Sequence, residues 1–344
     1  MTDIRTVFVT GASGFIGKHI VLRLLDDGYL VKGSVRSPAK AEEVRAAMAI
    51  HAADKSDLEN RLQLVELDLL LDGGWQQALS GCNALLHTAS PFPMNDPQNE
   101  DEVIRPAVEG TMRALKAARA AGIQRVVLTS SCAAIYYQNP MPDQLMVTED
   151  DWTDLASPAA NVYVRSKTLA ERAAWNFAGE NPGFELTTIN PCMVLGPALD
   201  RHFGTSLAVV ERIMKARDPA MPAVMIDVVD VRDIALMHVL ALSRPESIGE
   251  RLIGASGPIW FAEIGQVIKR AYPSRKVVTR QAPNLLIRLL ARFDHTLRTI
   301  TPMLGKEISA NNAKAGRILG IEFIDPDAAI LGSADFLLKN GFIR

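Results

Sequence analysis

The chain has 344 residues, of which 48% are hydrophobic and 22% charged, as in an ordinary globular protein. Its net charge of −2 gives no general electrostatic reason to bind nucleic acid or an anionic membrane. Three widely spaced cysteines without a C-x-x-C pair, and scattered histidines, lead us to expect reduced thiols in the cytoplasm and no bound metal. We also expect neither a signal peptide nor a membrane-spanning segment.

The first half of the chain alternates short apolar runs with alanine-rich stretches of helical period. Because the apolar runs would be buried on both faces, the pattern predicts an α/β fold with a doubly wound parallel sheet. The predicted strands and helices are 6–10, 15–26, 30–35, 39–53, 62–67, 84–88, 101–121, 125–130, 161–178 and 186–190.

Beyond residue 190 prolines and methionines become frequent, which favours a smaller C-terminal substrate-binding lobe. We expect the sheet domain to comprise residues 1–192 and about 222–245, and the lobe about 193–221 and 246–344. One short stretch of the lobe, 285–292, is amphipathic, with arginines four residues apart. We expect it to pack onto the lobe, with contact to a membrane surface as the alternative.

A glycine-rich turn joins the first predicted strand to the first predicted helix. Gly11, Gly14 and Gly17 have the spacing G-x-x-G-x-x-G. Glycines permit a tight turn and close approach of the backbone to a pyrophosphate, which then lies at the helix N-terminus. A P-loop does not fit, because Ala12 replaces its first glycine and His19 its magnesium-binding hydroxyl. The turn therefore predicts a dinucleotide site.

Basic residues follow the second predicted strand. Arg36 stands about 20 residues after Gly17, where a carboxylate would hold the ribose 2′-hydroxyl of NAD. An arginine there can bind a 2′-phosphate through two parallel hydrogen bonds, with Lys40 as a second positive charge. We therefore predict NADP(H) as the cofactor. Asp68, after the third strand, is a candidate for the adenine amine, with a helix-capping or loop carboxylate as the alternative.

Two residues on a later predicted helix can exchange a proton with a substrate. Tyr163 and Lys167 are four residues apart and therefore share one helix face. A positive charge beside a phenol favours the phenolate, which can exchange a proton with a carbonyl or alcohol near neutral pH. The alternative is an ordinary solvated helix with the same spacing.

Hydroxyl residues end the strand at 125–130. A hydroxyl at the carboxyl end of a parallel strand points into the ligand crevice, where it can donate to a substrate carbonyl. Thr129 and Ser130 can instead end the strand by bonding to backbone. We choose Ser131 as the catalytic hydroxyl, with Ser130 as the alternative.

The chain resembles the extended short-chain dehydrogenases/reductases, in the branch of dihydroflavonol, cinnamoyl-CoA and aldehyde reductases. The matching motifs occur in family order at 10–17, 35–37, 87–91, 108–111, 128–131, 149–152, 163–171, 190–197 and 230–233. The resemblance implies a Rossmann fold and the NADP-dependent reduction of an aldehyde or ketone to an alcohol. It implies Tyr163 as general acid, Lys167 as the ligand of the nicotinamide ribose and Ser131 as the group that orients the carbonyl. Further cofactor-binding residues implied are Ser13, Phe15, Ile16, Leu69, Thr88, Ala89, Ser90, Pro191 and Val194.

Departures from the family pattern narrow the class of substrate that we expect. The loop at 132–137 has no asparagine or aspartate of the kind linked to flavonoid recognition, so a dihydroflavonol is not expected. Apolar residues after the strands instead suit a hydrophobic carbonyl compound. The candidate pocket walls are 92–94, 135–137, Met193, His202, Phe203, Met221 and Met225.

Other functions remain open on the same scaffold. A nucleotide-sugar epimerase or dehydratase would keep its cofactor bound and consume no NADPH. A non-catalytic NADP sensor generally lacks the tyrosine–lysine pair. Helices 101–121 and 161–178 resemble elements that form a dimer bundle in some relatives, so we expect a monomer or a homodimer.

Overall fold

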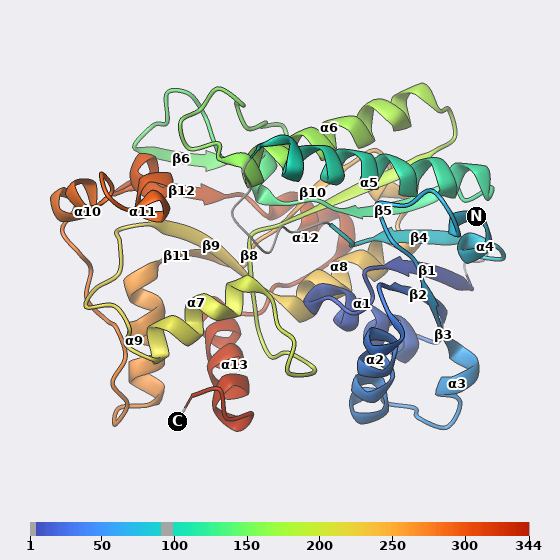
Figure 1. Ribbon diagram of the computed structural model, residues 1–344, viewed down its shortest axis with the longest axis horizontal. Helices are drawn as coiled ribbons and strands as arrows, with labels where there is room; N and C mark the ends of the chain where they lie inside the picture. Colours follow the sequence, from blue (N-terminus) through green and yellow to red (C-terminus); the bar gives the residue numbers. More distant parts are fainter. Residues whose placement is uncertain (1–4, 91–98, 344) are drawn as a thin grey trace.

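The apolar runs of the first half form one sheet of parallel strands. The computed structural model describes residues 5–90 and 99–343. Its main sheet has seven strands in the order β10-β7-β5-β4-β1-β2-β3, and every neighbouring pair is parallel (Figure 1). In chain order the strands are β1 Thr6–Thr10, β2 Leu30–Val35, β3 Leu62–Glu66, β4 Ala84–His87, β5 Arg125–Thr129, β7 Glu185–Pro191 and β10 Arg251–Gly254. The predicted doubly wound sheet is confirmed.

Alternate residues of the strands supply two cores, one on each face of the sheet. Val7 and Val9 of β1 join one core and Phe8 joins the other, as the two-residue period of a strand requires. The first core packs under α1 Phe15–Asp26, α2 Pro38–His51, α8 Val231–Ser243 and α12 Ala313–Leu319. The second packs under α4 Trp75–Leu79, α5 Asp101–Ala120 and α6 Val162–Glu180. α5 and α6 lie side by side along that face (Figure 1).

The strand order reverses between β1 and β4. From β1 the chain adds β2 and β3 on one side, and β4, β5, β7 and β10 on the other. In such sheets ligands bind at the carboxyl ends of the strands, at the point of reversal. The glycine turn follows β1 and therefore lies at this point.

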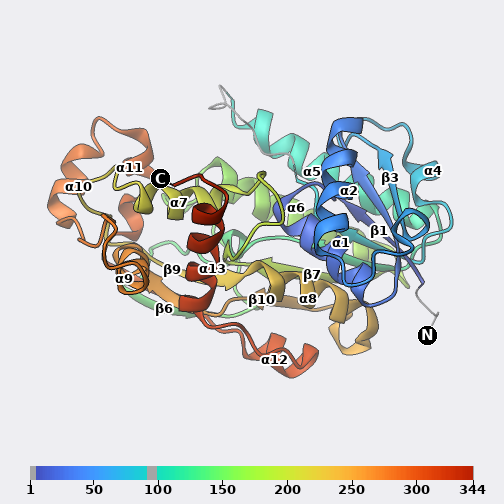
Figure 2. The same ribbon diagram turned by 90° about the horizontal axis from the view of Figure 1, so that it is seen from below.

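A smaller group of elements lies beside the main sheet (Figure 2). A second sheet has the order β11-β9-β8, and a third pairs β12 with β6. Their bounds are β6 Gln144–Val147, β8 Met193–Leu195, β9 Met225–Asp230, β11 Gly257–Trp260 and β12 Glu307–Ala310. The helices of this part are α7 Thr205–Met214, α9 Phe261–Ala271, α10 Asn284–Leu290, α11 His295–Ile300 and α13 Pro326–Lys339. Short connecting turns are α3 Leu58–Arg61, η1 Cys132–Ala134, η2 Pro245–Ser247 and η3 Thr301–Met303.

The division into two domains stays a prediction, but the sheets cross its boundaries. β10 lies in the range assigned to the lobe, yet it pairs with β7 in the main sheet. β9 lies in the range assigned to the sheet domain, yet it pairs with β8 and β11. The chain thus passes from the second sheet through α8 to the main sheet at β10, and returns to the second sheet at β11.

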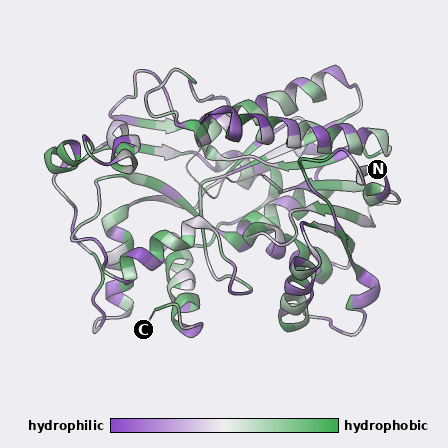
Figure 3. Ribbon diagram, in the orientation of Figure 1, coloured by the Kyte–Doolittle hydropathy of each residue, from purple (hydrophilic) through white to green (hydrophobic). Residues whose placement is uncertain are grey.

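The amphipathic stretch at 285–292 packs only in part. Ile287 and Ala291 are buried, whereas Leu285 and Phe293 are 82% and 87% exposed. The ribbon of α10 is accordingly green at the edge of the molecule (Figure 3). Among the described residues, no helix is long and apolar enough to cross a membrane.

Candidate functional site

The glycine turn is tightly closed at the carboxyl end of β1. A Cβ on Gly17 would lie 2.2 Å from the carbonyl oxygen of Gly11, so no other residue fits there. Gly11 has φ +66° and its missing Cβ would meet the Cα of Ala89 at 2.9 Å. The first-turn amides of α1 have no intrahelical acceptor, as at any helix start, and no side chain caps them at Gly14. This cradle fits a pyrophosphate at a helix N-terminus.

Residues at the end of β4 form the neighbouring wall of the turn. The Thr10 hydroxyl accepts hydrogen bonds from the amides of Thr88 (3.0 Å) and Ala89 (3.1 Å). Its own proton is then available to His87 Nδ1, 2.7 Å away. Burial, followed by the charge of Lys167, lowers the pKa of His87 to about 3, so this histidine is neutral. The predicted residues Thr88, Ala89 and Ser90 therefore lie directly beside the glycine turn.

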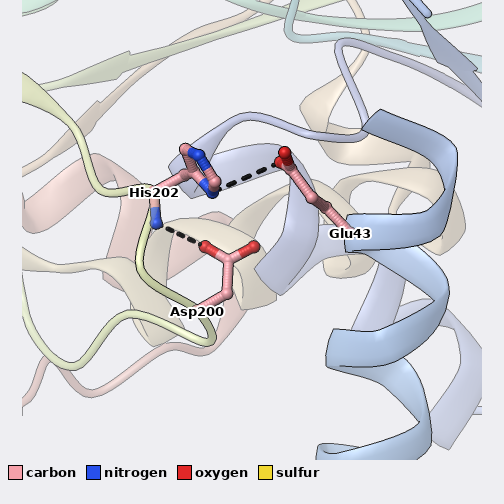
Figure 4. Close-up of side chains that lie close together, drawn as sticks. All are labelled: Glu43, Asp200 and His202. Atoms are coloured by element: carbon pink, nitrogen blue, oxygen red, sulfur yellow. Dashed lines mark hydrogen bonds and ion pairs between the residues drawn. The ribbon is translucent and has the colours of Figure 1, made fainter. Parts of the chain in front are cut away.

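The basic residues after β2 have different surroundings. Arg36 is exposed, and it forms no ion pair with any described residue. Lys40 already pairs with Glu43 at 2.7 Å. The Glu43 carboxylate also lies 3.3 Å from His202 Nδ1, and the amide of His202 donates to Asp200 at 2.8 Å (Figure 4).

Asp200 in turn pairs with the buried Lys18 of α1. Lys18 was not among the predicted site residues. Burial lowers the pKa of its ammonium, which the hydrogen bond to Asp200 partly offsets. The carboxylates of Glu43 and Asp200 each have a lysine ammonium as a partner. Together with His202, these side chains connect the loop after β8 to α1 and α2.

Asp68 and Leu69 follow β3 at the same edge of the sheet. Asp68 is exposed, and one of its oxygens accepts from the amide of Leu70 at 2.9 Å. The carbonyl of Leu69 accepts from Arg113 at 2.6 Å. The local turn therefore uses one oxygen of the exposed Asp68 carboxylate.

Tyr163 and Lys167 lie in the first two turns of α6. Asn161 begins the helix, and its side chain accepts from the amide of Val164 at 3.0 Å. The ammonium of Lys167 lies 5.8 Å from the centre of the Tyr163 ring, so the predicted pair is formed. Lys167 also lines a small cavity with Ala89, Ser90 and Ser130. The pair thus lies beside the wall that meets the glycine turn.

The three hydroxyls at the end of β5 have three different partners. Thr129 Oγ1 lies 2.7 Å from His238 Nε2, and Ser130 Oγ donates to the carboxylate of Glu171. Ser131 Oγ accepts from the amide of Ala133 at 3.1 Å and begins the short helix η1. It donates to no described residue, so its hydrogen is available to a ligand.

A buried polar network behind Ser131 had no predicted role. Glu171 is 1% exposed and accepts from Asn190 Nδ2 and Arg251 Nε, each at 2.7 Å. Asn190 Nδ2 also lies 3.2 Å from the carbonyl oxygen of Ser131. The guanidinium of Arg251 lies 3.8 Å from the centre of the Trp152 ring. These contacts hold the backbone that carries Ser131 in place. In the sequence, the only indication of this network was the presence of polar residues in an otherwise apolar strand.

The predicted pocket walls divide into core and site. Met193 and Met221 are buried in the core of the second sheet, and Phe203 stacks edge-on against Phe342. Tyr137 packs against η1 and α6, and burial, followed by the negative charge of an ionised Tyr163, raises its pKa to about 12. Of the predicted nicotinamide neighbours, Pro191 ends β7 and Val194 lies in β8, and both are buried. Residues 92–94 lie outside the described residues.

Comparison with known proteins agrees with this geometry. A family model described as the NAD dependent epimerase/dehydratase family matches residues 7–253. A cinnamoyl-CoA reductase of Medicago truncatula is 36% identical over 342 residues, covering 98% of this chain and 96% of that protein. An NADPH-dependent methylglyoxal reductase of Saccharomyces cerevisiae is 34% identical over 289 residues, covering 79% of this chain and 84% of that protein. The crystal structure of yeast methylglyoxal/isovaleraldehyde reductase complexed with NADPH gives a TM-score of 0.81 at 29% identity, covering 98% of this chain and all of that one (100%).

A parallel sheet with a glycine turn at its point of reversal defines a dinucleotide-binding α/β protein. The chain belongs to the NAD-dependent epimerase/dehydratase family, that is, to the extended short-chain dehydrogenases/reductases. The predicted family is thereby confirmed, and the chain is an oxidoreductase of the Rossmann type.

Proposed function

We propose that this protein is an NADP(H)-dependent carbonyl reductase that interconverts a hydrophobic aldehyde or ketone and its alcohol. The observation that carries the proposal is the Tyr163–Lys167 pair, which adjoins the wall of the glycine turn. Methylglyoxal reductases among the relatives are named as NADPH-dependent, and a yeast relative of the same fold was crystallised with NADPH.

The chain's residues provide a place for each part of NADPH. The first-turn amides of α1 hold the pyrophosphate, and Arg36 with Lys40 binds the 2′-phosphate. Asp68 and Leu69 face the adenine, while Thr88, Ala89 and Ser90 flank the path to the nicotinamide. Lys167 holds the nicotinamide ribose, with Pro191 and Val194 beside the ring. When bound, the cofactor supplies the hydride.

The protein supplies placement and the proton. Ser131 Oγ donates a hydrogen bond to the carbonyl oxygen and stabilises the negative charge that develops there. Tyr163 Oη gives that oxygen its proton during reduction, and takes it back during alcohol oxidation. Lys167 favours the phenolate form that each cycle regenerates.

The two alternative functions have less support. An epimerase keeps the same scaffold and the same pair, but the relatives that are 34–36% identical in sequence are named as reductases. A sensor has no use for a tyrosine–lysine pair. For the compartment and the assembly we keep the sequence expectations, a cytoplasmic protein that is a monomer or a homodimer and binds no nucleic acid or membrane.

The function is tested by following NADPH absorbance with a panel of aromatic, aliphatic and α-dicarbonyl substrates. We expect NADPH consumption with at least one hydrophobic carbonyl and formation of the matching alcohol. Absence of turnover across the panel, together with cofactor retained through purification, would favour the epimerase instead. The same assay with NADH measures the cofactor preference.

A further inference from the structure

Two of the three cysteines lie in contact beside the predicted catalytic serine. The sulfurs of Cys132 and Cys192 are 2.8 Å apart. Cys132 directly follows Ser131, and Cys192 directly follows Pro191. Because a disulfide bond is about 2.05 Å long, the sulfurs need to approach by only roughly 0.8 Å to be joined.

The backbone keeps these two thiols together. β5 and β7 are parallel neighbours, and the amide of Ser130 donates to the carbonyl of Ile189 at 2.8 Å. The thiol of Cys132 lies 3.0 Å from the carbonyl oxygen of Asn190, one residue before Pro191. The two cysteines thus lie just after two paired strands, and hydrogen bonds between these segments hold them side by side.

Cys192 is the more exposed of the two cysteines. Cys132 is 1% exposed, whereas Cys192 is half-buried. The Tyr136 hydroxyl lies 3.2 Å from the Cys192 sulfur and donates to Asp227 at 2.6 Å. Since Tyr136 gives its own proton to Asp227, it can accept one from Cys192. We therefore expect an oxidant to react with Cys192 first, and Cys132 to act as the resolving thiol.

We propose that Cys132 and Cys192 form a modification site, an oxidisable dithiol that peroxide converts to a disulfide, which inactivates the enzyme reversibly. The Cys192 sulfur attacks one oxygen of hydrogen peroxide, the O–O bond breaks, and Cys192 sulfenic acid and one water are formed. The Cys132 sulfur then attacks the sulfenic sulfur, its proton leaves with the hydroxide as a second water, and the S–S bond forms. Two thiols lose two electrons, which reduce one peroxide to two waters. A dithiol reductant reverses the change by thiol–disulfide exchange.

The bond joins the loop of the catalytic hydroxyl to the strand end beside the predicted nicotinamide position. Drawing the two segments together displaces Ser131 relative to Tyr163, and a misplacement of this size costs up to about a hundredfold in rate. This consequence rests on the proposed reductase function, whereas formation of the bond does not.

The bond is tested on the purified full-length protein by treatment with hydrogen peroxide, alkylation under denaturing conditions, and peptide mass spectrometry. We expect one linked peptide pair containing Cys132 and Cys192, while Cys82 is alkylated. Cys82 is a matched control, because it is also buried but lies just before β4, at the opposite edge of the sheet. Equal alkylation of all three cysteines, or linkage through Cys82, would overturn the site.

The effect on activity is tested as the ratio of oxidised to reduced turnover within each variant, so that basal activities need not match. Wild type and Cys82→Ala are expected to lose roughly tenfold or more and to recover with dithiothreitol. Cys192→Ala and Cys132→Ala should show no reversible loss. A linked pair with unchanged turnover would overturn the inactivation, and equal loss in the cysteine variants would assign it to another residue. If the reduced enzyme has no reductase activity, the proposed function fails while the mapping still decides the bond.

Discussion

Three consecutive hydroxyls end β5, and their partners distinguish their roles. The hydroxyls of Thr129 and Ser130 form hydrogen bonds with His238 and Glu171, so their protons are already donated inside the protein. Ser131 accepts from its own short helix and still has a proton to donate. The sequence left Ser130 and Ser131 as alternatives, and the hydrogen bonds favour Ser131 as the group that contacts substrate.

Replacing the two serines separately tests this assignment. Ser131→Ala should lower kcat by about 10²–10³-fold, as loss of one donor to a developing oxyanion does. Ser130→Ala should leave kcat within a few-fold but lower the free energy of unfolding by about 1–3 kcal/mol, because buried Glu171 loses a donor. Steady-state kinetics and urea unfolding of both variants measure the two effects. The reverse pattern would make Ser130 the catalytic hydroxyl.

Arg36 is exposed and pairs with no described carboxylate, so its guanidinium is available to a 2′-phosphate. Arg36→Ala should lower kcat/KM for NADPH by roughly ten- to a hundredfold, in line with the loss of charged hydrogen bonds, and leave NADH almost unaffected. Arg45→Ala is the matched control, since Arg45 is also exposed on this side of the sheet but pairs with Glu42 on α2. An unchanged preference between the two cofactors in Arg36→Ala would assign the 2′-phosphate to other residues.

Among the elements of the fold, the turn between β1 and α1 leaves the least room for side chains larger than glycine. Gly11, Gly14 and Gly17 lie within a few ångströms of one another and of Ala89. An added methyl group at Gly17 would meet backbone, which cannot move aside as a flexible side chain can. The turn thereby fixes the direction in which the first-turn amides of α1 point.

Two glycine-to-alanine replacements separate this geometry from general effects on helices. Gly17→Ala should abolish NADPH binding or prevent folding, because the new Cβ lies 2.2 Å from the Gly11 oxygen. Gly179→Ala, in α6 with nothing within 4 Å, should raise the free energy of unfolding by about 0.5–1 kcal/mol. Cofactor titration by fluorescence measures the NADPH affinity of both variants, and urea unfolding measures their stability. Normal NADPH affinity in Gly17→Ala would show that the turn is not the pyrophosphate site.

At the scale of the whole molecule, buried histidines join distant parts of the chain. His19 of α1 lies 2.9 Å from the carbonyl oxygen of Pro197 after β8, and His238 of α8 contacts Thr129. Burial lowers the pKa of His19 and of His238 to about 4, and that of His87 to about 3. All three are therefore neutral in the folded protein, and unfolding lets them take up protons below their unfolded pKa.

Stability should consequently fall as the pH decreases from about 7.5 to about 5.5. Over this interval the unfolded state binds more protons at the three histidines, which costs the folded state about 4 kcal/mol. Asp227 and Asp233 act in the opposite direction, because burial raises the pKa of each to about 6 and the folded state gains protons there. These two aspartates stabilise the folded state by about 1.6 kcal/mol over the same interval. The free energy of unfolding should therefore fall by roughly 2 kcal/mol in total, measured by urea unfolding at each pH. A constant or rising stability would show that the histidines are not buried and neutral.

Local patterns predicted the elements better than the contacts between them. The strand–helix alternation, the glycine turn and the spacing of Tyr163 and Lys167 depend on neighbouring residues, and the structure has all of them. The role of Glu171 and Arg251 was not predictable, because their ion pair joins positions 80 residues apart. β6 and β12 were missed for the same reason, since a two-stranded sheet between distant segments leaves no periodic signal. β10 was placed in the lobe because composition, and not strand pairing, set the boundary.

In the proposed function, Tyr163 transfers the proton in an NADPH-dependent carbonyl reduction. The most direct test measures turnover and NADPH affinity for wild type, Tyr163→Phe and Tyr137→Phe with one active carbonyl substrate. Tyr137 is the matched control, because it is a second phenol of the same region whose pKa burial raises to about 12. Proton transfer by Tyr163 predicts that Tyr163→Phe lowers kcat by about 10²–10⁴-fold with nearly unchanged NADPH affinity, while Tyr137→Phe stays within a few-fold of wild type. Turnover that survives in Tyr163→Phe, or is lost in Tyr137→Phe instead, would contradict it.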